Sequence, residues 1–247
     1  MANMRKRPIS RWTVPVAALA LALPLSGCGS GNSDDADSPQ AKKAPHAGRS
    51  ADAEKGGLPG VGERLQRKVP ERSRQVLAVY GAGRDSAKAQ VRLYVKRGDQ
   101  WKETRHWSGH NGKRGWTFHH RENDKRSPIG VYTVSDAGGL KPDPGAKLPY
   151  RQSVSFTPPS YWGKSKRNDF DHVIAIDYNR VRGTSPLDPT RPQGQSKGGS
   201  IWLHLDHGSG TSGCVSISRS GMRELLRTLD PDQHPVVVMG DRAALRA

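Results

Sequence analysis

The sequence predicts a mainly β domain with a single helix near its C-terminal end. Glycine (28 residues) and proline (18) are abundant among the 247 residues, which favours many turns and short strands over a helix bundle. Apolar and polar residues alternate with period two, most clearly in residues 90–97. One stretch has helical spacing instead, with apolar side chains at Met222, Leu225, Leu226 and Leu229.

Each predicted strand is a short run of β-branched, aromatic and aliphatic residues bounded by turn-forming residues. These runs are 75–81, 90–97, 100–107, 130–135, 151–156, 172–178, 200–205, 214–217 and 235–240. We expect the helix to begin at an N-cap Ser220 and to stop at Asp230–Pro231, with a second short helical stretch around Glu63–Lys68. The polar segments 136–150 and 179–199 are longer than connections alone require, and in an enzyme they would wall a substrate cleft.

The N-terminus is typical of an exported lipoprotein. Arg5, Lys6, Arg7 and Arg11 precede an apolar stretch, Trp12–Leu25, that is too short for a comfortable membrane span. It ends in 25-LSGC-28, which resembles the lipobox whose cysteine is lipidated and becomes the first mature residue. We therefore expect residues 1–27 to be a lipoprotein signal peptide and Cys28 to anchor the chain to the outer face of the cell membrane. An ordinary secretory signal with an incidental cysteine is the alternative.

The folded domain is predicted to begin after a disordered tether. Residues 29–57 contain no Val, Ile, Leu, Met, Phe, Trp or Tyr, so we assign residues 28–60 to a tether and residues 61–247 to the domain. Of the net charge of +17, residues 1–27 carry +4 and residues 28–60 carry −1, which leaves +14 for the domain. An exported basic domain meets anionic wall polymers and lipid head groups, so we expect no nucleic-acid partner.

The stretch 201-IWLHLDHGSGTSGCVSIS-218 holds the residues that indicate chemistry. With Cys28 lipidated, Cys214 would be an unpaired thiol in an oxidising compartment. A thiol is nucleophilic only as thiolate, so it needs a base, and His204 lies on the preceding predicted strand. The turn at Thr211, Ser212 and Gly213 could return Cys214 alongside His204 and aim backbone N–H groups at an oxyanion. A small buried side chain without chemistry is the alternative.

Other polar residues have two interpretations each. His207 lies either on a solvated turn or in the site, and His172 and Tyr178 flank strand 173–176, where they could line the cleft. The pair His119–His120 borders a charged run and is predicted to cap a loop. Asp206 is too close to His204 along one strand edge to be its orienting carboxylate.

The same stretch, with 127-SPIGVYTV-134 upstream, resembles the L,D-transpeptidase catalytic domain (the YkuD family) of bacterial cell-wall enzymes. The likeness covers residues 75–240 and implies a YkuD-like β-sandwich or open barrel with one helix after the catalytic cysteine. His204, Thr211, Ser212, Gly213 and Cys214 match the family signature. Ser212 replaces the family's usual histidine, Ser216 replaces its usual arginine or asparagine, and the interval from histidine to cysteine is short.

The resemblance implies acyl transfer on peptidoglycan stem peptides, without a cofactor or a metal. Cys214 would attack the amide before a terminal D-Ala, with His204 as base oriented by a backbone carbonyl, and the thioester would pass to an amine or to water. Anionic cell-wall polymers are further expected partners. Two alternatives stay open: a zinc-dependent wall peptidase using the histidines with Cys214, and a non-catalytic wall-binding lipoprotein.

Overall fold

The structure is a computed structural model that describes residues 56–247; the predicted signal peptide, Cys28 and most of the predicted tether lie outside the described residues. Its strands are β1 (Gln75–Gly81), β2 (Lys88–Arg97), β3 (Gln100–His110), β4 (Trp116–Thr117), β5 (Ser127–Pro128), β6 (Gly130–Gly139), β7 (Tyr150–Gln152), β8 (Val173–Ile176), β9 (Trp202–Leu205), β10 (Val215–Ile217) and β11 (Val236–Asp241). Its α-helices are α1 (Glu63–Gln66), α2 (Arg219–Thr228) and α3 (Arg242–Arg246). None of the helices in this described part is long and apolar enough to cross a membrane.

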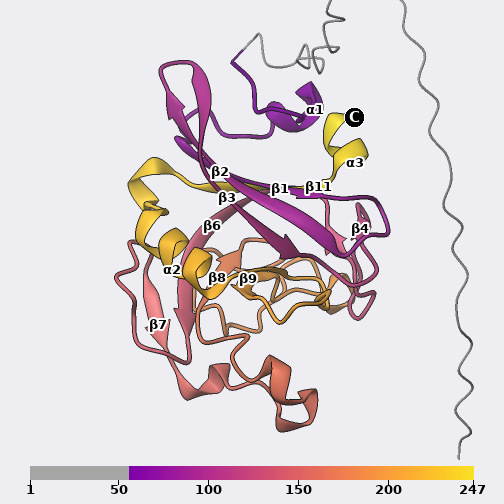
Figure 1. Cartoon of the computed structure of the whole chain (residues 1–247), viewed down its shortest axis with the longest axis vertical. Coiled ribbons are helices and arrows are strands. Elements are labelled where there is room, and N and C mark those ends of the chain that lie inside the picture. Colours follow the sequence, from indigo (N-terminus) through magenta and orange to yellow (C-terminus); the bar gives the residue numbers. More distant parts are fainter. Residues whose placement is uncertain (1–55) are drawn as a thin grey trace, which may run out of the picture. The chain divides into compact units, whose positions relative to one another are not determined.

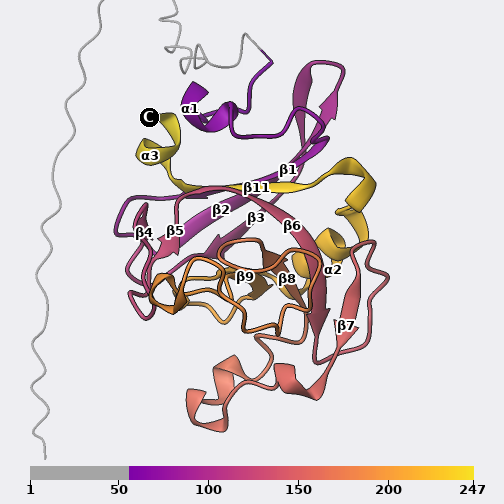
Figure 2. The same ribbon diagram turned by 180° about the vertical axis from the view of Figure 1, so that it is seen from behind.

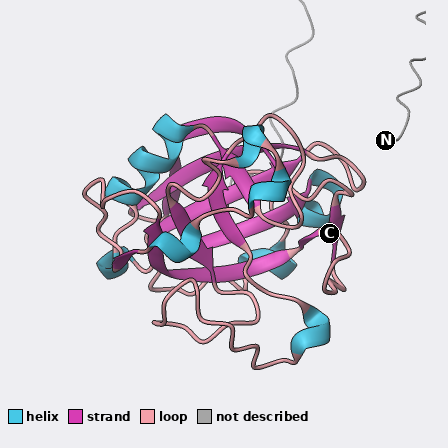
Figure 3. Ribbon diagram, turned by 90° about the horizontal axis from the view of Figure 1, so that it is seen from below, coloured by secondary structure: helices cyan, strands magenta, loops and turns pink. Residues whose placement is uncertain are grey.

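The main sheet closes on itself. Its strand order is β11-β1-β2-β3-β10-β9-β8-β6-β7, and β11 also pairs with β6, so eight strands form a continuous ring with β7 attached outside it. The prediction of a mainly β, YkuD-like fold is confirmed, and the additional pairing of β11 with β6 joins the sheet into a ring. Strands occupy the centre of the molecule and helices and loops its periphery (Figure 3).

Strands β1 and β11 are buried along their whole length and are mainly apolar, with Gln75 and Asp241 as the polar end residues. Leu77 and Val79 point into the main core inside the barrel, whereas the alternating residues Val76 and Ala78 belong to a second cluster outside it. Leu58, Leu65 and Leu245, from the N-terminal segment, α1 and α3, cover that second cluster. Figures 1 and 2 show α1 and α3 beside β1 and β11, on the side of the barrel away from β8 and β9. Leu58 is thus buried three residues before the predicted start of the domain at Val61.

Helix α2 follows the cysteine as predicted, and its apolar residues Met222, Leu225 and Leu226, with the C-cap Leu229, are fully buried in the main core. Its N-cap is Ser218 and not the predicted Ser220; the Ser218 Oγ accepts a hydrogen bond from the Gly221 N–H. Two other elements differ from the prediction. The predicted strand 151–156 ends at Gln152 and continues as the 3-10 helix Val154–Phe156, and α3 was not predicted.

The pairing of β9 with β10 is parallel, with Val215 opposite Leu203 and Ser216 opposite His204. The connection, residues 206–214, must therefore run back along β9 before β10 begins. Nine residues is a short connection for a parallel pair. It crosses over the end of β3: Thr211 N–H donates to the Asn111 carbonyl (2.9 Å), and Lys113 N–H donates to the Thr211 carbonyl (2.8 Å). At Gly210 an added Cβ would stand 2.5 Å from Lys113 Cα, so only glycine fits there.

Candidate active site

Cys214 and His204 lie on the same outer face of the barrel. Because β9 and β10 are parallel, Cys214 falls opposite Trp202, and His204 is two residues further along its strand. Leu203 and Val215, between them, point into the main core, so the side chains of 202, 204 and 214 point outward. Strand spacing and rise put the α-carbons of His204 and Cys214 about 8 Å apart, which an imidazole and a thiol can bridge.

The Cys214 thiol is free and partly buried. Its Sγ accepts a hydrogen bond from the Trp202 N–H (3.4 Å) and donates one to the Ser200 carbonyl oxygen (3.5 Å). Burial raises the pKa of the Cys214 thiol to about 11, which outweighs the lowering effect of the Trp202 N–H. The resting side chain is therefore a thiol, held by backbone groups of the neighbouring strand.

His204 is 3% exposed and its ring has a fixed tautomer. Nδ1 lies 2.8 Å from the Leu205 carbonyl oxygen, which can only accept, so Nδ1 carries the proton and Nε2 keeps its lone pair. Burial lowers the pKa of His204 to about 4. The neutral ring is thus oriented by a backbone carbonyl as a proton acceptor.

His207 and Asp169 form a second buried pair beside His204. The side chains of His207 and Asp169 are 4% and 5% exposed, and His207 Nδ1 lies 3.1 Å from Asp169 Oδ2. The rings of His204 and His207 are parallel at 6.2 Å between centroids. Burial raises the pKa of Asp169 to about 7 and lowers the pKa of His207. The solvated-turn alternative for His207 is therefore wrong, because its side chain is buried against Asp169.

Asp206 does not contact His204. One of its oxygens, Oδ1, accepts from the Ser216 hydroxyl (2.7 Å) and lies 2.8 Å from His110 Nδ1. Burial alone would raise the pKa of Asp206, but these hydrogen bonds lower it. Asp206 thus fixes β3, β9 and β10 to one another next to the site.

The loop before Cys214 is stiffened by the hydroxyl group of Thr211. Thr211 Oγ1 donates to the Cys214 carbonyl oxygen (2.6 Å) and accepts from the Gly213 N–H (3.1 Å). The Gly213 N–H is thereby committed to Thr211 and does not point freely at an oxyanion. Ser212 is exposed and, with Gly213, lines a cavity of about 120 Å³ at Cys214. We call this space the thiol cavity.

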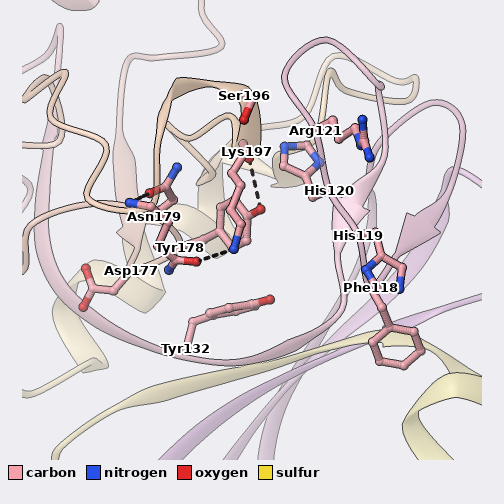
Figure 4. A pocket seen from close by; sticks show the side chains of 11 residues that line it. Phe118, His119, His120, Arg121, Tyr132, Asp177, Tyr178, Asn179, Ser196 and Lys197 are labelled. Atoms are coloured by element: carbon pink, nitrogen blue, oxygen red, sulfur yellow. Dashed lines mark hydrogen bonds between the residues drawn. The ribbon is translucent and has the colours of Figure 1, made fainter.

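A larger cavity of about 550 Å³ lies next to the thiol cavity, and His120 lines both. Figure 4 shows His119–Arg121 on one side of this outer cavity and Tyr178, Asn179 and Lys197 on the other. Tyr178, predicted as a cleft residue, lies here, edge-on to His120 at 5.3 Å between centroids. The predicted loop 179–199 supplies one wall.

His120 is a site residue that the sequence prediction missed. It is 7% exposed, and its Cε1 would lie 3.5 Å from a Cβ added to Gly213. Its Nδ1 lies 3.0 Å from Asp124 Oδ1, and both carboxylate oxygens of Asp124 accept backbone N–H groups of the same loop, from Arg121 and Arg126. His120 lies beside Gly213 in the fold but 93 residues before it in the sequence, so no local sequence pattern indicates the contact.

Asn179 holds the wall that residues 179–199 supply to the outer cavity. Asn179 is 3% exposed and has a left-handed φ of 45°; its amide donates to the carbonyls of Gly194 (3.0 Å) and Gly198 (2.6 Å).

His172 lines neither cavity: its Nδ1 lies 3.0 Å from the Tyr150 hydroxyl. Its predicted place in the cleft is wrong because it precedes β8 at the end remote from Tyr178. Within residues 56–247 no group of three or more His, Cys, Asp or Glu side chains is placed to hold a metal ion.

Comparison with known families gives this fold and site a class. The L,D-transpeptidase catalytic domain (YkuD) matches residues 85–238, well over half of the chain. The chain therefore belongs to the L,D-transpeptidase catalytic domain family, whose members act on the bacterial cell wall.

Two solved structures are similar at low identity. The helical cell shape determining protein Pgp2 from Campylobacter jejuni shares 16% identity, with a TM-score of 0.41, over 70% of this chain and 49% of that one. Bd1075 from Bdellovibrio bacteriovorus shares 17% identity, with a TM-score of 0.43, over 75% of this chain and 54% of that one. This chain thus spans about half the length of each. No curated protein matches it.

Proposed function

We propose that this chain is a cysteine-dependent L,D-transpeptidase of the cell wall, anchored by lipid at Cys28 to the extracytoplasmic face of the membrane. The observation that carries the proposal is the placement of a free thiol, which lines a cavity, and a histidine on the same outer face of the barrel, with a tautomer that leaves Nε2 as acceptor. Family membership supports acyl transfer between peptidoglycan stem peptides as the reaction class.

The reaction follows from these groups. The Sγ–H proton of Cys214 moves to His204 Nε2 as sulfur attacks the carbonyl carbon of the stem peptide amide. The C–N bond then breaks, the imidazolium returns the proton to the leaving D-Ala amine, and a thioester remains. An amine of a second stem, or water, attacks the thioester and releases the thiol. Arg121 and Lys197 in the outer cavity suit the carboxylates of a stem peptide.

The test is direct. The full-length protein is incubated with a disaccharide-tetrapeptide stem, and protein and products are weighed by mass spectrometry. The expected result is a mass increase on Cys214 and either a cross-linked dimer or a trimmed tripeptide. Cys214→Ala should form neither while keeping the wild-type melting temperature, and unchanged turnover in that variant would overturn the proposal. Fatty-acid labelling that is lost in Cys28→Ser tests the anchor.

One observation favours a second candidate, a non-catalytic wall-binding lipoprotein. The resting thiol is bonded to two backbone groups, and burial raises its pKa, as in an inert buried cysteine. A carbapenem, a known covalent inhibitor class for this family, separates the two. A transpeptidase should gain the mass of the drug on Cys214, whereas a binding protein should stay unmodified and still sediment with isolated cell walls.

A further inference from the structure

A separate hollow lies on the outer side of β1 and β2, on the α1 and α3 side of the barrel. It measures about 170 Å³ and is lined by Arg92, Arg242 and Arg246 together with Tyr80, Tyr94 and the turn Pro59–Gly60. We call it the arginine pocket. The α1 and α3 side is the one that faces away from β8 and β9, so the pocket and the thiol cavity belong to different faces of the barrel (Figures 1 and 2).

The base of the arginine pocket is rigid. Tyr80 and Tyr94 are 4% and 3% exposed, the Tyr80 hydroxyl donates to the Pro59 carbonyl oxygen (2.6 Å), and the two hydroxyls are 3.5 Å apart. Burial raises the pKa of both phenols, so they stay neutral. The guanidinium carbons of Arg92 and Arg242 lie 6.0 and 5.5 Å from the centre of the Tyr80 ring. One buried aromatic side chain therefore positions two cations.

The positive charge of the pocket is not balanced. Arg92 pairs with Glu103 at 2.8 Å, but among residues 56–247 no carboxylate lies within 4.0 Å of Arg242 or Arg246. Both of these arginines are exposed on α3, so their guanidinium groups are open to a ligand from solution. Guanidinium groups present several N–H donors in a planar fork that matches the oxygens of a phosphate.

We propose that the arginine pocket binds the phosphate group of a small phosphate ester, such as a glycerol phosphate unit. Its volume holds a phosphate and a few carbons but is well below the roughly 300 Å³ at which pockets for larger ligands begin. An anionic lipid head group and a soluble glycerol phosphate share this chemistry. The proposal does not depend on the transpeptidase activity, because none of its residues touches the thiol cavity.

The test titrates the full-length protein with sn-glycerol 3-phosphate and, separately, inorganic phosphate by calorimetry. Arg242→Gln/Arg246→Gln removes two charges from the pocket. The matched control, Arg97→Gln/Lys102→Gln, removes two exposed charges at the β2–β3 hairpin. We expect the pocket variant to bind at least tenfold more weakly and the control to stay within twofold of wild type. Equal losses in both variants, or no binding by the wild type at millimolar ligand, would overturn the site.

A second arm identifies the source of the phosphate. Cys28→Ser protein, which lacks the anchoring residue, is sedimented with phosphatidylglycerol vesicles and with phosphatidylcholine vesicles. Sedimentation with phosphatidylglycerol that Arg242→Gln/Arg246→Gln abolishes assigns the pocket to a lipid head group, and glycerol phosphate binding without sedimentation assigns it to a soluble ester. Sedimentation that the pocket substitutions leave unchanged counts against the site. Because Cys214→Ala should keep full phosphate binding, failure here is distinct from failure of the transpeptidase proposal.

Discussion

Burial moves the pKa values of Cys214 and His204 in opposite directions, and both shifts favour the uncharged forms. The thiol pKa rises to about 11 and the imidazole pKa falls to about 4, so a resting thiolate–imidazolium pair is disfavoured. Proton transfer is then expected only as a carbonyl carbon approaches sulfur, when the bond being formed removes the thiolate charge. The sequence indicated only that His204 could serve as the base that makes Cys214 a thiolate, and the burial of both groups adds that this transfer waits for the substrate.

Alkylation should report this protonation state. We expect iodoacetamide to modify Cys214 in Cys28→Ser protein on the order of 100-fold more slowly at pH 7 than an ordinary thiol, because far less thiolate is present. The rate should climb about tenfold per pH unit with no plateau below pH 10. Denatured protein, with an ordinary thiol pKa, is the control. A plateau reached below pH 7 would instead indicate a preformed ion pair.

The same burial makes His204 a source of acid sensitivity. Its pKa falls to about 4 on folding, so between about pH 6.5 and 4 the unfolded chain binds a proton that the folded chain does not. The contribution of neutral His204 to the free energy of unfolding is therefore complete above pH 6.5 and is lost as the pH falls through 4. By pH 4 the loss amounts to about 3 kcal/mol relative to His204→Gln. Urea unfolding of both proteins at pH 7 and pH 4 measures this difference. Asp169, with its raised pKa, gives an opposite slope that is common to both proteins and cancels.

At the residue scale the sequence indicated Cys214 and His204 because they share one short segment. His120 escaped prediction because only the fold brings it to Gly213, and the pair with Asp124 resembles any polar loop contact. His172 was misplaced for the opposite reason. It adjoins the same strand as Tyr178, but the two flank opposite ends of it, and only Tyr178 lies in a cavity.

At the scale of elements, the loop 206–214 explains why small residues separate His204 from Cys214. The loop must return along β9 while lying against the end of β3, and side chains at its contact points would hold it away. The sequence indicated the turn but not the parallel pairing, since period-two patterns carry no strand direction. Likewise Val154 and Phe156 fit a strand by alternation, although Val154 is 81% exposed and the backbone is a 3-10 helix.

Gly210→Ala tests the docking of this loop. The new Cβ would stand 2.5 Å from Lys113 Cα and 2.8 Å from Ala87 Cβ, so the loop must shift. We expect carbapenem acylation of Cys214 to slow by at least tenfold and stability to fall by about 1–3 kcal/mol. Gly83→Ala is the matched control, because its Cβ would meet only Ser86 Cβ, at 4.0 Å. Equal acylation rates in the two variants would show that the loop does not position the thiol.

For the whole molecule, the barrel wall separates the thiol face from the cluster under α1 and α3. Leu245 is fully buried in that cluster, and the Gly62 N–H donates to its carbonyl at 2.8 Å. We expect Leu245→Ala to lower the free energy of unfolding by about 2–4 kcal/mol, as other buried leucines do. Acylation of Cys214 in the folded protein should stay within twofold of wild type. Val154→Ala, at an exposed position, should leave stability unchanged. A large loss of acylation in Leu245→Ala would mean that the two faces are coupled.

The last strand of the chain closes the ring, since β11 pairs with β1 in parallel and with β6 in antiparallel fashion. Val76 meets Val236 across 160 residues of sequence, so the core cannot be completed until nearly the whole polypeptide is available. A chain that still lacks its final dozen residues lacks β11 and cannot close the ring. Closure of the barrel is therefore a late step that waits for the C-terminal strand.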